Sequence, residues 1–294
     1  MWIAVTNRFR QFHKNLLLTE DQIRDGTTKN QNVRKCLNQH YYGSDSGTEN
    51  SFLVGSWAKL TRVRPPRDVD VYFELPVSVY HRLEQTAGNK QSAILQEVKR
   101  VLQGTYPVTD MRGDGQVVIV RFNTMNVEVA PVFLLDNGRY YFCNTHNGGS
   151  YDVADPVAET NHIASVDRTN NNNLRPLIRM MKTWQSHCSV PIKSFQLELV
   201  MADFLQQSPW RENSLFYYDW FVRDFFAYLH SKANGYVFAP GTMKAIALGD
   251  DWLSRCETAY HRAFRACEHE RDDHVDLAGE EWQKIFGTMI PKNP

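Results

Sequence analysis

The stretch that decides the fold is residues 55–73, GSWAKLTRVRPPRDVDVYF. It opens with a Gly-Ser pair and ends in alternating acidic and apolar residues that are typical of a β-strand. Because successive side chains of a strand point to opposite faces, Asp68 and Asp70 project to one side and the valines between them to the other. The sequence therefore places two carboxylates close together on one face of a sheet.

Two neighbouring carboxylates repel each other unless a positive charge lies between them. Mg²⁺ binds such carboxylates together with the phosphates of a substrate. The turn at Gly55-Ser56 adds backbone N–H groups and a hydroxyl, which suit a phosphate. We therefore expect metal-assisted phosphoryl or nucleotidyl transfer.

Composition sets the limits of this interpretation. The chain has 294 residues, of which 42% are hydrophobic and 22% charged, and its formal net charge is zero. This balance gives no chain-wide attraction to long nucleic acids, and no run approaches the roughly 20 apolar residues of a membrane span. The five cysteines are scattered without a CxxC pair, and the N-terminal stretch is too polar for a secretory signal. We expect reduced thiols and a cytoplasmic location.

The chain changes character near residue 156. Apolar spacing predicts helices over residues 3–17, 19–39 and 89–103, and strands over residues 68–73, 117–122, 127–133 and 140–142. The Asp-Asn-Gly sequence at 136–138 predicts a hairpin. The later part is mostly helical, over residues 157–167, 172–188, 194–207, 214–231, 250–269 and 276–286. We predict two domains, residues 1–156 and 157–294.

A third carboxylate is expected because two-metal nucleotidyl transfer usually needs a further oxygen ligand. Glu128 is the candidate, since it lies in a valine-rich strand where a buried charge without a partner would be costly. The alternative is a glutamate that faces outward on an edge strand.

The helix over residues 174–184 carries two distinct faces. Leu174, Leu177, Ile178 and Met181 form an apolar stripe, and Arg175, Arg179 and Lys182 recur at i, i+4 and i+7 on another face. The cations either bind phosphate or form a solvated face. The same two alternatives hold for the basic residues after the Gly-Ser pair, which are Lys59, Arg62, Arg64 and Arg67.

Together these features resemble the DNA polymerase β-type nucleotidyltransferases, and more narrowly the bacterial cGAS/DncV-like enzymes (CD-NTases), relatives of cGAS and oligoadenylate synthase. The resemblance rests on Gly55-Ser56, on Asp68 and Asp70, and on the frame Glu128-Val129-Ala130-Pro131, where the family most often has Asp. It extends from the Gly-Ser pair to about residue 205.

Further resemblance lies in the helical part. The helix over residues 174–184 resembles the family's LxxLIRxxKxW helix, which implies that Lys182 contacts nucleotide phosphates. The sequence Lys193-Ser194-Phe195 resembles a KSF segment, which implies that Ser194 contacts the triphosphate and Phe195 stacks on a base. The alternatives are a helix N-cap for Ser194 and a core position for Phe195.

The resemblance implies an α+β fold, with a polymerase β-like core built on a mixed β-sheet. A helical, oligoadenylate-synthase-like C-terminal domain packs against it, and the active-site cleft lies between the lobes. Asp68, Asp70 and Glu128 would bind two Mg²⁺ or Mn²⁺ ions, and Gly55, Ser56, Lys182, Ser194 and Phe195 would bind the nucleotide. The expected reaction condenses NTPs into a cyclic di- or trinucleotide with release of pyrophosphate.

In that family the product acts as a second messenger in CBASS-type anti-phage signalling and switches on a separate effector protein. We expect a monomer with ATP or another NTP as substrate and no membrane partner, and the balanced charge gives no strong sign of activation by nucleic acid. The alternatives are a linear oligonucleotide synthase, a protein-modifying nucleotidyltransferase, or an inactive nucleotide-binding regulator, which the Glu at position 128 would favour.

Overall fold

The computed structural model describes residues 3–294, which form two compact units. The first unit, which we call the helical unit, contains residues up to 17, 61–64 and 161–294. The second, which we call the sheet unit, contains residues 18–60 and 65–160. Each unit is described by itself.

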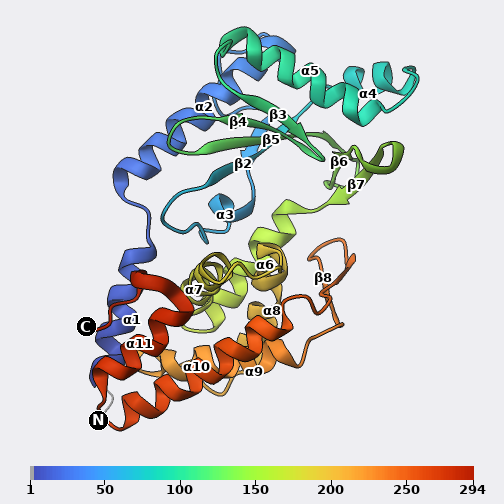
Figure 1. The fold of residues 1–294 in the computed structure, drawn as a ribbon. Helices are drawn as coiled ribbons and strands as arrows, with labels where there is room; N and C mark the ends of the chain where they lie inside the picture. Colours follow the sequence, from blue (N-terminus) through green and yellow to red (C-terminus); the bar gives the residue numbers. More distant parts are fainter. Residues whose placement is uncertain (1–2) are drawn as a thin grey trace. The chain divides into compact units, whose positions relative to one another are not determined.

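The sheet unit is built on a seven-stranded sheet (Figure 1). Its strands lie in the order β1-β2-β5-β4-β3, and in addition β6 pairs with β5 and β7 pairs with β6. The β2 and β5 strands are parallel and every other pair is antiparallel, so the sheet is mixed, as predicted. The strands are β1 (Ser51–Leu53), β2 (Asp68–Glu74), β3 (Met111–Asp114), β4 (Val117–Arg121), β5 (Asn126–Leu134), β6 (Tyr140–Asn144) and β7 (Ser150–Ala154).

One face of this sheet packs against helices. The alternate residues Val69, Val71 and Phe73 of β2 are buried, as are Val127 and Val129 of β5. They belong to a hydrophobic core that also contains side chains of α2 (Glu20–Tyr42), α4 (Val77–Glu84) and α5 (Lys90–Thr105). In Figure 1 these helices lie on one side of the sheet. The other residues of β2 and β5, including the acidic ones, therefore project from the opposite face.

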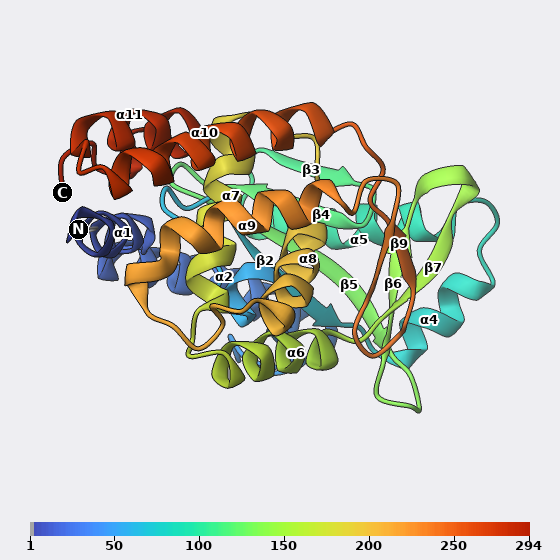
Figure 2. The same ribbon diagram turned by 90° about the horizontal axis from the view of Figure 1, so that it is seen from below.

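The helical unit has its own core. Three tryptophans, Trp184, Trp252 and Trp282, are fully buried among its helices, and α9, α10 and α11 pack side by side (Figures 1 and 2). A two-stranded sheet, β8 (Tyr236–Phe238) with β9 (Ala245–Ala247), adjoins them. The helices are α1 (Ile3–Leu16), α7 (Leu174–His187), α8 (Ser194–Gln207), α9 (Tyr218–His230), α10 (Leu253–Arg271) and α11 (Val275–Phe286), and α6 (Pro156–Thr169) begins in the sheet unit.

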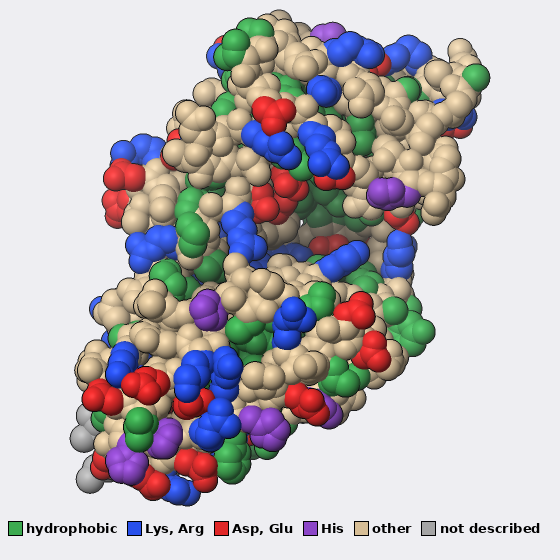
Figure 3. All heavy atoms as spheres, in the orientation of Figure 1, with side chains coloured by type: hydrophobic (Ala, Val, Ile, Leu, Met, Phe, Trp, Pro, Cys, Tyr) green, Lys and Arg blue, Asp and Glu red, His purple; other side chains and the backbone are tan. Residues whose placement is uncertain are grey.

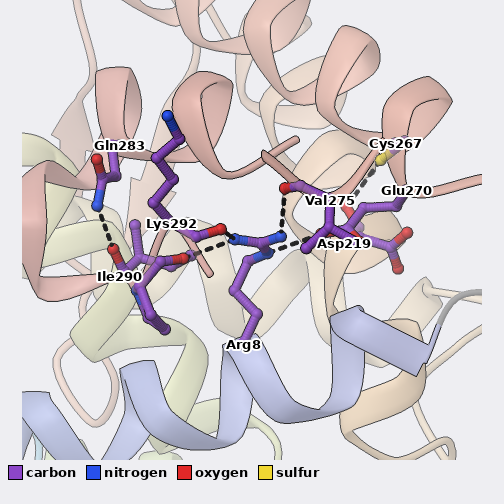
Figure 4. Close-up of polar contacts among 9 residues, drawn as sticks. Arg8, Asp219, Cys267, Glu270, Val275, Gln283, Ile290 and Lys292 are labelled. Carbon is purple, nitrogen blue, oxygen red and sulfur yellow. Dashed lines mark hydrogen bonds and ion pairs between the residues drawn. The ribbon is translucent and has the colours of Figure 1, made fainter. Parts of the chain in front are cut away.

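The α1 helix belongs to the helical unit because Arg8 and its apolar face are buried there. The Arg8 guanidinium donates to Oε1 of Glu270 over 2.8 Å, to the carbonyl of Pro291 over 2.6 Å, and to the carbonyls of Lys292 and Val275 (Figure 4). Phe9 and Phe12 are also fully buried in the core of the helical unit. The compact units thus differ from the division at residue 156, which grouped the first helix with the sheet.

Most predicted elements are present. The helix at 19–39 begins where expected, since the Thr19 hydroxyl accepts from the backbone N–H of Gln22 in a capping box. The hairpin at 136–138 joins β5 to β6 as predicted. Residues 150–154 form a further strand that the sequence pattern did not predict, and it pairs with β6. Residues 1 and 2 of the predicted first domain lie outside the described residues.

No helix between residues 3 and 294 is both long enough and apolar enough to cross a membrane. On the face displayed in Figure 3, acidic and basic side chains are interspersed over much of the surface, in keeping with the net charge of zero. The five cysteines are free thiols, as expected.

Candidate active site

The candidate site is centred on one face of β2 and β5. Asp68 and Asp70 alternate with buried valines along β2, so both carboxylates lie on the face opposite the helices. In the parallel register, Asp70 is directly beside Glu128, and Asp68 is beside Asn126. The three predicted acidic residues therefore share one face on two adjacent strands, and Glu128 is not on an edge strand because β5 lies between β2 and β4.

The Gly-Ser turn is fixed against these carboxylates. The backbone N–H of Val54 donates to the carbonyl of Asp70 over 3.0 Å, and the indole N–H of Trp57 donates to the carbonyl of Asp68 over 2.8 Å. Gly55 has φ +56°, and a Cβ atom there would lie 2.2 Å from Oδ2 of Asp70. Only glycine fits both the left-handed backbone and the close approach of the carboxylate. Ser56 follows it in the short helix α3 (Gly55–Ala58).

Negative charge is concentrated on this face. Burial, followed by the nearby charges of Asp68 and Asp114, raises the pKa of Glu128 to about 6. A cation would relieve this repulsion, and carboxylate oxygens are the ligands that Mg²⁺ and Mn²⁺ prefer. No three His, Cys, Asp or Glu side chains within residues 3–294 are already gathered at one metal position. Since Mg²⁺ usually takes only one or two carboxylates together with phosphates and water, the donor chemistry fits the ion.

In the helical unit, Lys182 of α7 is paired with an acidic residue. Its Nζ lies 2.6 Å from Oε1 of Glu198 on α8 and 3.1 Å from Oγ1 of Thr61. Thr61 is fully buried and its hydroxyl donates to the same Glu198 oxygen over 2.8 Å. The side chain of Lys182 keeps 13% of its surface exposed, against 4% for Glu198. The ammonium also donates to the carbonyl of Thr61 over 3.4 Å, so three acceptors hold it in place.

Ser194 and Phe195 begin α8. The N-cap is Lys193, so the alternative of a Ser194 cap was wrong. The Ser194 hydroxyl instead donates to Oε1 of Gln185 on α7 over 2.9 Å. Gln185 lies about one helical turn after Lys182 on the same helix. Phe195 is half-buried against the core of the helical unit. The α7 and α8 helices are thus joined by two polar contacts, Lys182 with Glu198 and Gln185 with Ser194.

Among the other predicted cations, Arg175, Arg179 and Lys59 are paired or buried, whereas Arg67 is exposed. Arg175 is bound to Asp167, with Nη1 and Oδ2 2.7 Å apart, and Arg179 is only 9% exposed. Lys59 is buried and lies 3.1 Å from a carboxylate oxygen of Glu159. Sequence reasoning missed Glu159 and Thr61, because neither belongs to a motif and only the tertiary structure brings them to their lysines.

The structure thus gathers the predicted site residues into two sets, one in each unit. Gly55, Ser56, Asp68, Asp70 and Glu128 share the sheet unit, and Lys182, Ser194 and Phe195 share the α7–α8 pair of the helical unit. The cleft that would combine the two sets stays a prediction.

Comparison with known proteins identifies the family. Residues 3–167 match the model of the Second Messenger Oligonucleotide or Dinucleotide Synthetase domain, SMODS. The chain belongs to the SMODS family. The predicted membership of the bacterial CD-NTases is thereby confirmed, and the chain is a nucleotidyltransferase of the cyclic oligonucleotide synthase class.

Relatives of this SMODS protein extend over nearly its whole length. A cyclic AMP-AMP-AMP synthase of Acinetobacter is 22% identical over 282 residues, which are 92% of this chain and 81% of the relative. Among solved structures, Escherichia coli CdnC in complex with HORMA-deltaN has a TM-score of 0.72 at 17% identity, covering 98% of both chains. The Vibrio cholerae cyclic AMP-GMP synthase DncV, bound to the linear intermediate pppA(3′,5′)pG, has a TM-score of 0.67 at 14% identity over 98% of this chain and 87% of that one. These structures confirm the predicted α+β nucleotidyltransferase fold.

Proposed function

We propose that this SMODS enzyme condenses nucleoside triphosphates into a cyclic di- or trinucleotide and releases pyrophosphate. The observation that carries the proposal is the placement of Asp68, Asp70 and Glu128 on one face of adjacent strands, with Gly55 directly against Asp70. The relatives named for cyclic AMP-AMP-AMP and cyclic AMP-GMP synthesis support a cyclic product made from purine nucleotides.

Asp68 and Asp70 are the residues that would hold a divalent cation, with Glu128 as a further ligand. Mg²⁺ or Mn²⁺ bound there would supply charge neutralisation for the triphosphate and lower the pKa of the attacking ribose hydroxyl. The protein's own contribution is positional, because the backbone N–H groups of the Gly55-Ser56 turn can donate to phosphate oxygens beside the carboxylates. Lys182 and Ser194 would neutralise and bind the leaving pyrophosphate.

The pairing of Lys182 with Glu198 is compatible with this role. Glu198 and Thr61 hold the ammonium of Lys182 through three acceptors, so a phosphate would bind it by replacing one of the contacts with Thr61. The Ser194 hydroxyl donates to Gln185 and keeps its lone pairs as acceptors, so it would donate to phosphate only after rotating. Phe195 is half-buried, which leaves part of its ring for a base.

The test uses the full chain with labelled ATP, GTP, CTP and UTP and either Mg²⁺ or Mn²⁺. A phosphatase-resistant product is expected for a cyclic nucleotide, and the double variant Asp68→Asn, Asp70→Asn should make none while keeping its thermal unfolding temperature. Asp136→Asn, in the exposed hairpin turn, is the matched control for loss of one carboxylate. Residual turnover in the double variant would overturn the assignment of the site.

The same assay separates the other functions. A phosphatase-sensitive oligomer would indicate linear synthesis, and labelled protein would indicate a protein-modifying enzyme. NTP binding without any product would indicate a regulator.

We further propose that the product is a second messenger for a separate effector in anti-phage defence. Cells that carry this chain together with an effector that its product switches on should resist phage, and the double variant should lose that resistance. Equal plaque counts for the two would contradict the defence role.

A further inference from the structure

Three aromatic rings adjoin the carboxylates on the same face of the sheet. Phe52 of β1 is paired with Tyr72 of β2, two residues after Asp70, and their ring centroids are 5.8 Å apart. Tyr140 of β6 lies 5.2 Å from Phe52 and 6.4 Å from Tyr72, again between ring centroids. We call Phe52, Tyr72 and Tyr140 the aromatic trio.

The trio shares the face of the carboxylates by strand register. Tyr72 follows Asp68 and Asp70 at two-residue steps along β2, so its ring begins about 7 Å from Asp70 along the strand. Tyr140 is paired with Leu134, which alternates with Glu128 along β5 and therefore lies on the same face. Phe52 also precedes the Gly55 turn by only three residues. The trio, the turn and the acidic residues thus form one continuous surface within the sheet unit.

The trio is not part of a hydrophobic core. Its three rings are half-buried, and in the described part of the chain they belong neither to the two core clusters nor to the side chains packed against them. The rings are tilted to one another by 54° to 71°, so none covers the face of another by stacking. On the other face of β6, by contrast, Tyr141 stacks on Tyr151 at 23° and packs against the core.

The hydroxyl of Tyr72 adds polar character to this surface. The phenol of a tyrosine is protonated at neutral pH, so the Tyr72 O–H can donate a hydrogen bond. A phenol beside three half-buried rings suits a ligand that is flat, aromatic and rich in hydrogen-bond acceptors.

We infer that the aromatic trio is a base subsite that binds the purine of a nucleoside triphosphate whose phosphates lie at the Gly55 turn. This inference rests on the proposed function for the phosphate position. Aromatic rings bind bases by stacking, and the larger purine surface gains more from three surrounding rings than a pyrimidine does. Tyr140 is the ring to test for discrimination between purine and pyrimidine bases, because its strand, β6, carries none of the proposed metal ligands.

The experiment compares Tyr140→Leu with Tyr141→Leu, the adjacent residue on the opposite face of the same strand. Wild-type protein should have a higher kcat/KM for ATP and GTP than for CTP and UTP. Tyr140→Leu should lower kcat/KM for the purine nucleotides by about 5- to 150-fold, the range that one base–aromatic stack contributes, and should narrow the purine preference. Tyr141→Leu should leave the preference as in wild type, even if it lowers the unfolding temperature.

An unchanged purine preference in Tyr140→Leu, or no preference in wild type, would overturn the subsite. If wild-type protein releases no pyrophosphate from any NTP, the proposed function fails instead. The subsite is then tested by calorimetric titration with ATP and with UTP, where Tyr140→Leu should weaken ATP binding by the same factor and UTP binding less. Equal loss for both nucleotides would reject a purine site.

Discussion

Replacing Gly55 with alanine should inactivate the enzyme through Asp70 without unfolding it. The new Cβ atom would lie 2.2 Å from Oδ2 and 2.9 Å from Cγ of Asp70. Because carbon atoms in contact sit about 3.5–4 Å apart, the carboxylate or the turn must move by about 1 Å. A displacement of that size in a catalytic group can cost about 100-fold in rate, and this is the loss we expect in kcat.

A second cost of this substitution is backbone strain, which a control can separate. Gly43, at the C-terminus of α2, has φ +66°, which is close to the φ of +56° at Gly55. A Cβ atom added at Gly43 would meet nothing within 4 Å. Both alanine variants should lose about 1–2 kcal/mol of unfolding free energy for a left-handed non-glycine residue. Only Gly55→Ala carries the additional contact with Asp70.

The assay is the initial rate of pyrophosphate release over a range of Mg²⁺ concentrations, together with the thermal unfolding temperature of each variant. Gly43→Ala should keep the wild-type rate with a small loss of stability, and Gly55→Ala should lose the rate. If Gly55→Ala turns over like Gly43→Ala, the Gly-Ser turn does not position Asp70 and the reasoning fails.

Three further predictions concern the helical unit. Arg8→Met leaves Glu270 buried without its cation and should cost about 3–5 kcal/mol of unfolding free energy, seen as a fall of about 10 °C in the unfolding temperature. A fall no larger than the one caused by replacing an exposed arginine of α1 would contradict this prediction. Burial raises the pKa of Asp219 to about 7, so the folded state keeps a proton that the unfolded chain loses near pH 4, and stability should fall between about pH 4 and 7. Asp219→Asn should therefore unfold at a higher temperature than wild type at pH 8 but not at pH 4, and lower stability at pH 8 would refute this. Lys182→Met should destabilise the protein by about 3 kcal/mol and raise the KM for NTP, and adding Glu198→Gln should restore stability but not KM; recovery of both would make Lys182 a purely structural cation.

Local periodicity predicted the strand of Asp68 and Asp70 well. The alternation of β2 placed Asp68 and Asp70 on one face, and the structure confirms that face because the intervening valines are buried. The pairing of Asp70 with Glu128 is different in kind, since it depends on a parallel register between distant segments that no local pattern encodes. The valine-rich strand made Glu128 the candidate, and the resemblance to a family supported it through the frame Glu128-Val129-Ala130-Pro131.

Long-range partners were beyond the sequence. The face of α7 formed by Arg175, Arg179 and Lys182 could be read as solvated or as phosphate-binding, and the choice depended on which acids the tertiary fold supplies. The counter-ions are Asp167 for Arg175 and Glu198 for Lys182. The same limitation explains why α1 was grouped with the sheet, because its buried residues contact helices that lie more than 150 residues later in the chain.

The attachment of α1 to the last helices gives the chain an unusual order of folding during synthesis. The sheet unit consists of residues 18–160 except for the short segment 61–64. These residues leave the ribosome before the last helices are made, so the sheet unit can fold soon after its last strand emerges. The α1 helix is made before the sheet unit, but Arg8 finds its partners only after Glu270 and the carbonyls of Pro291 and Lys292 have been made. Until then Phe9 and Phe12 lack the core that buries them, and this part of the nascent chain is exposed to chaperones and proteases.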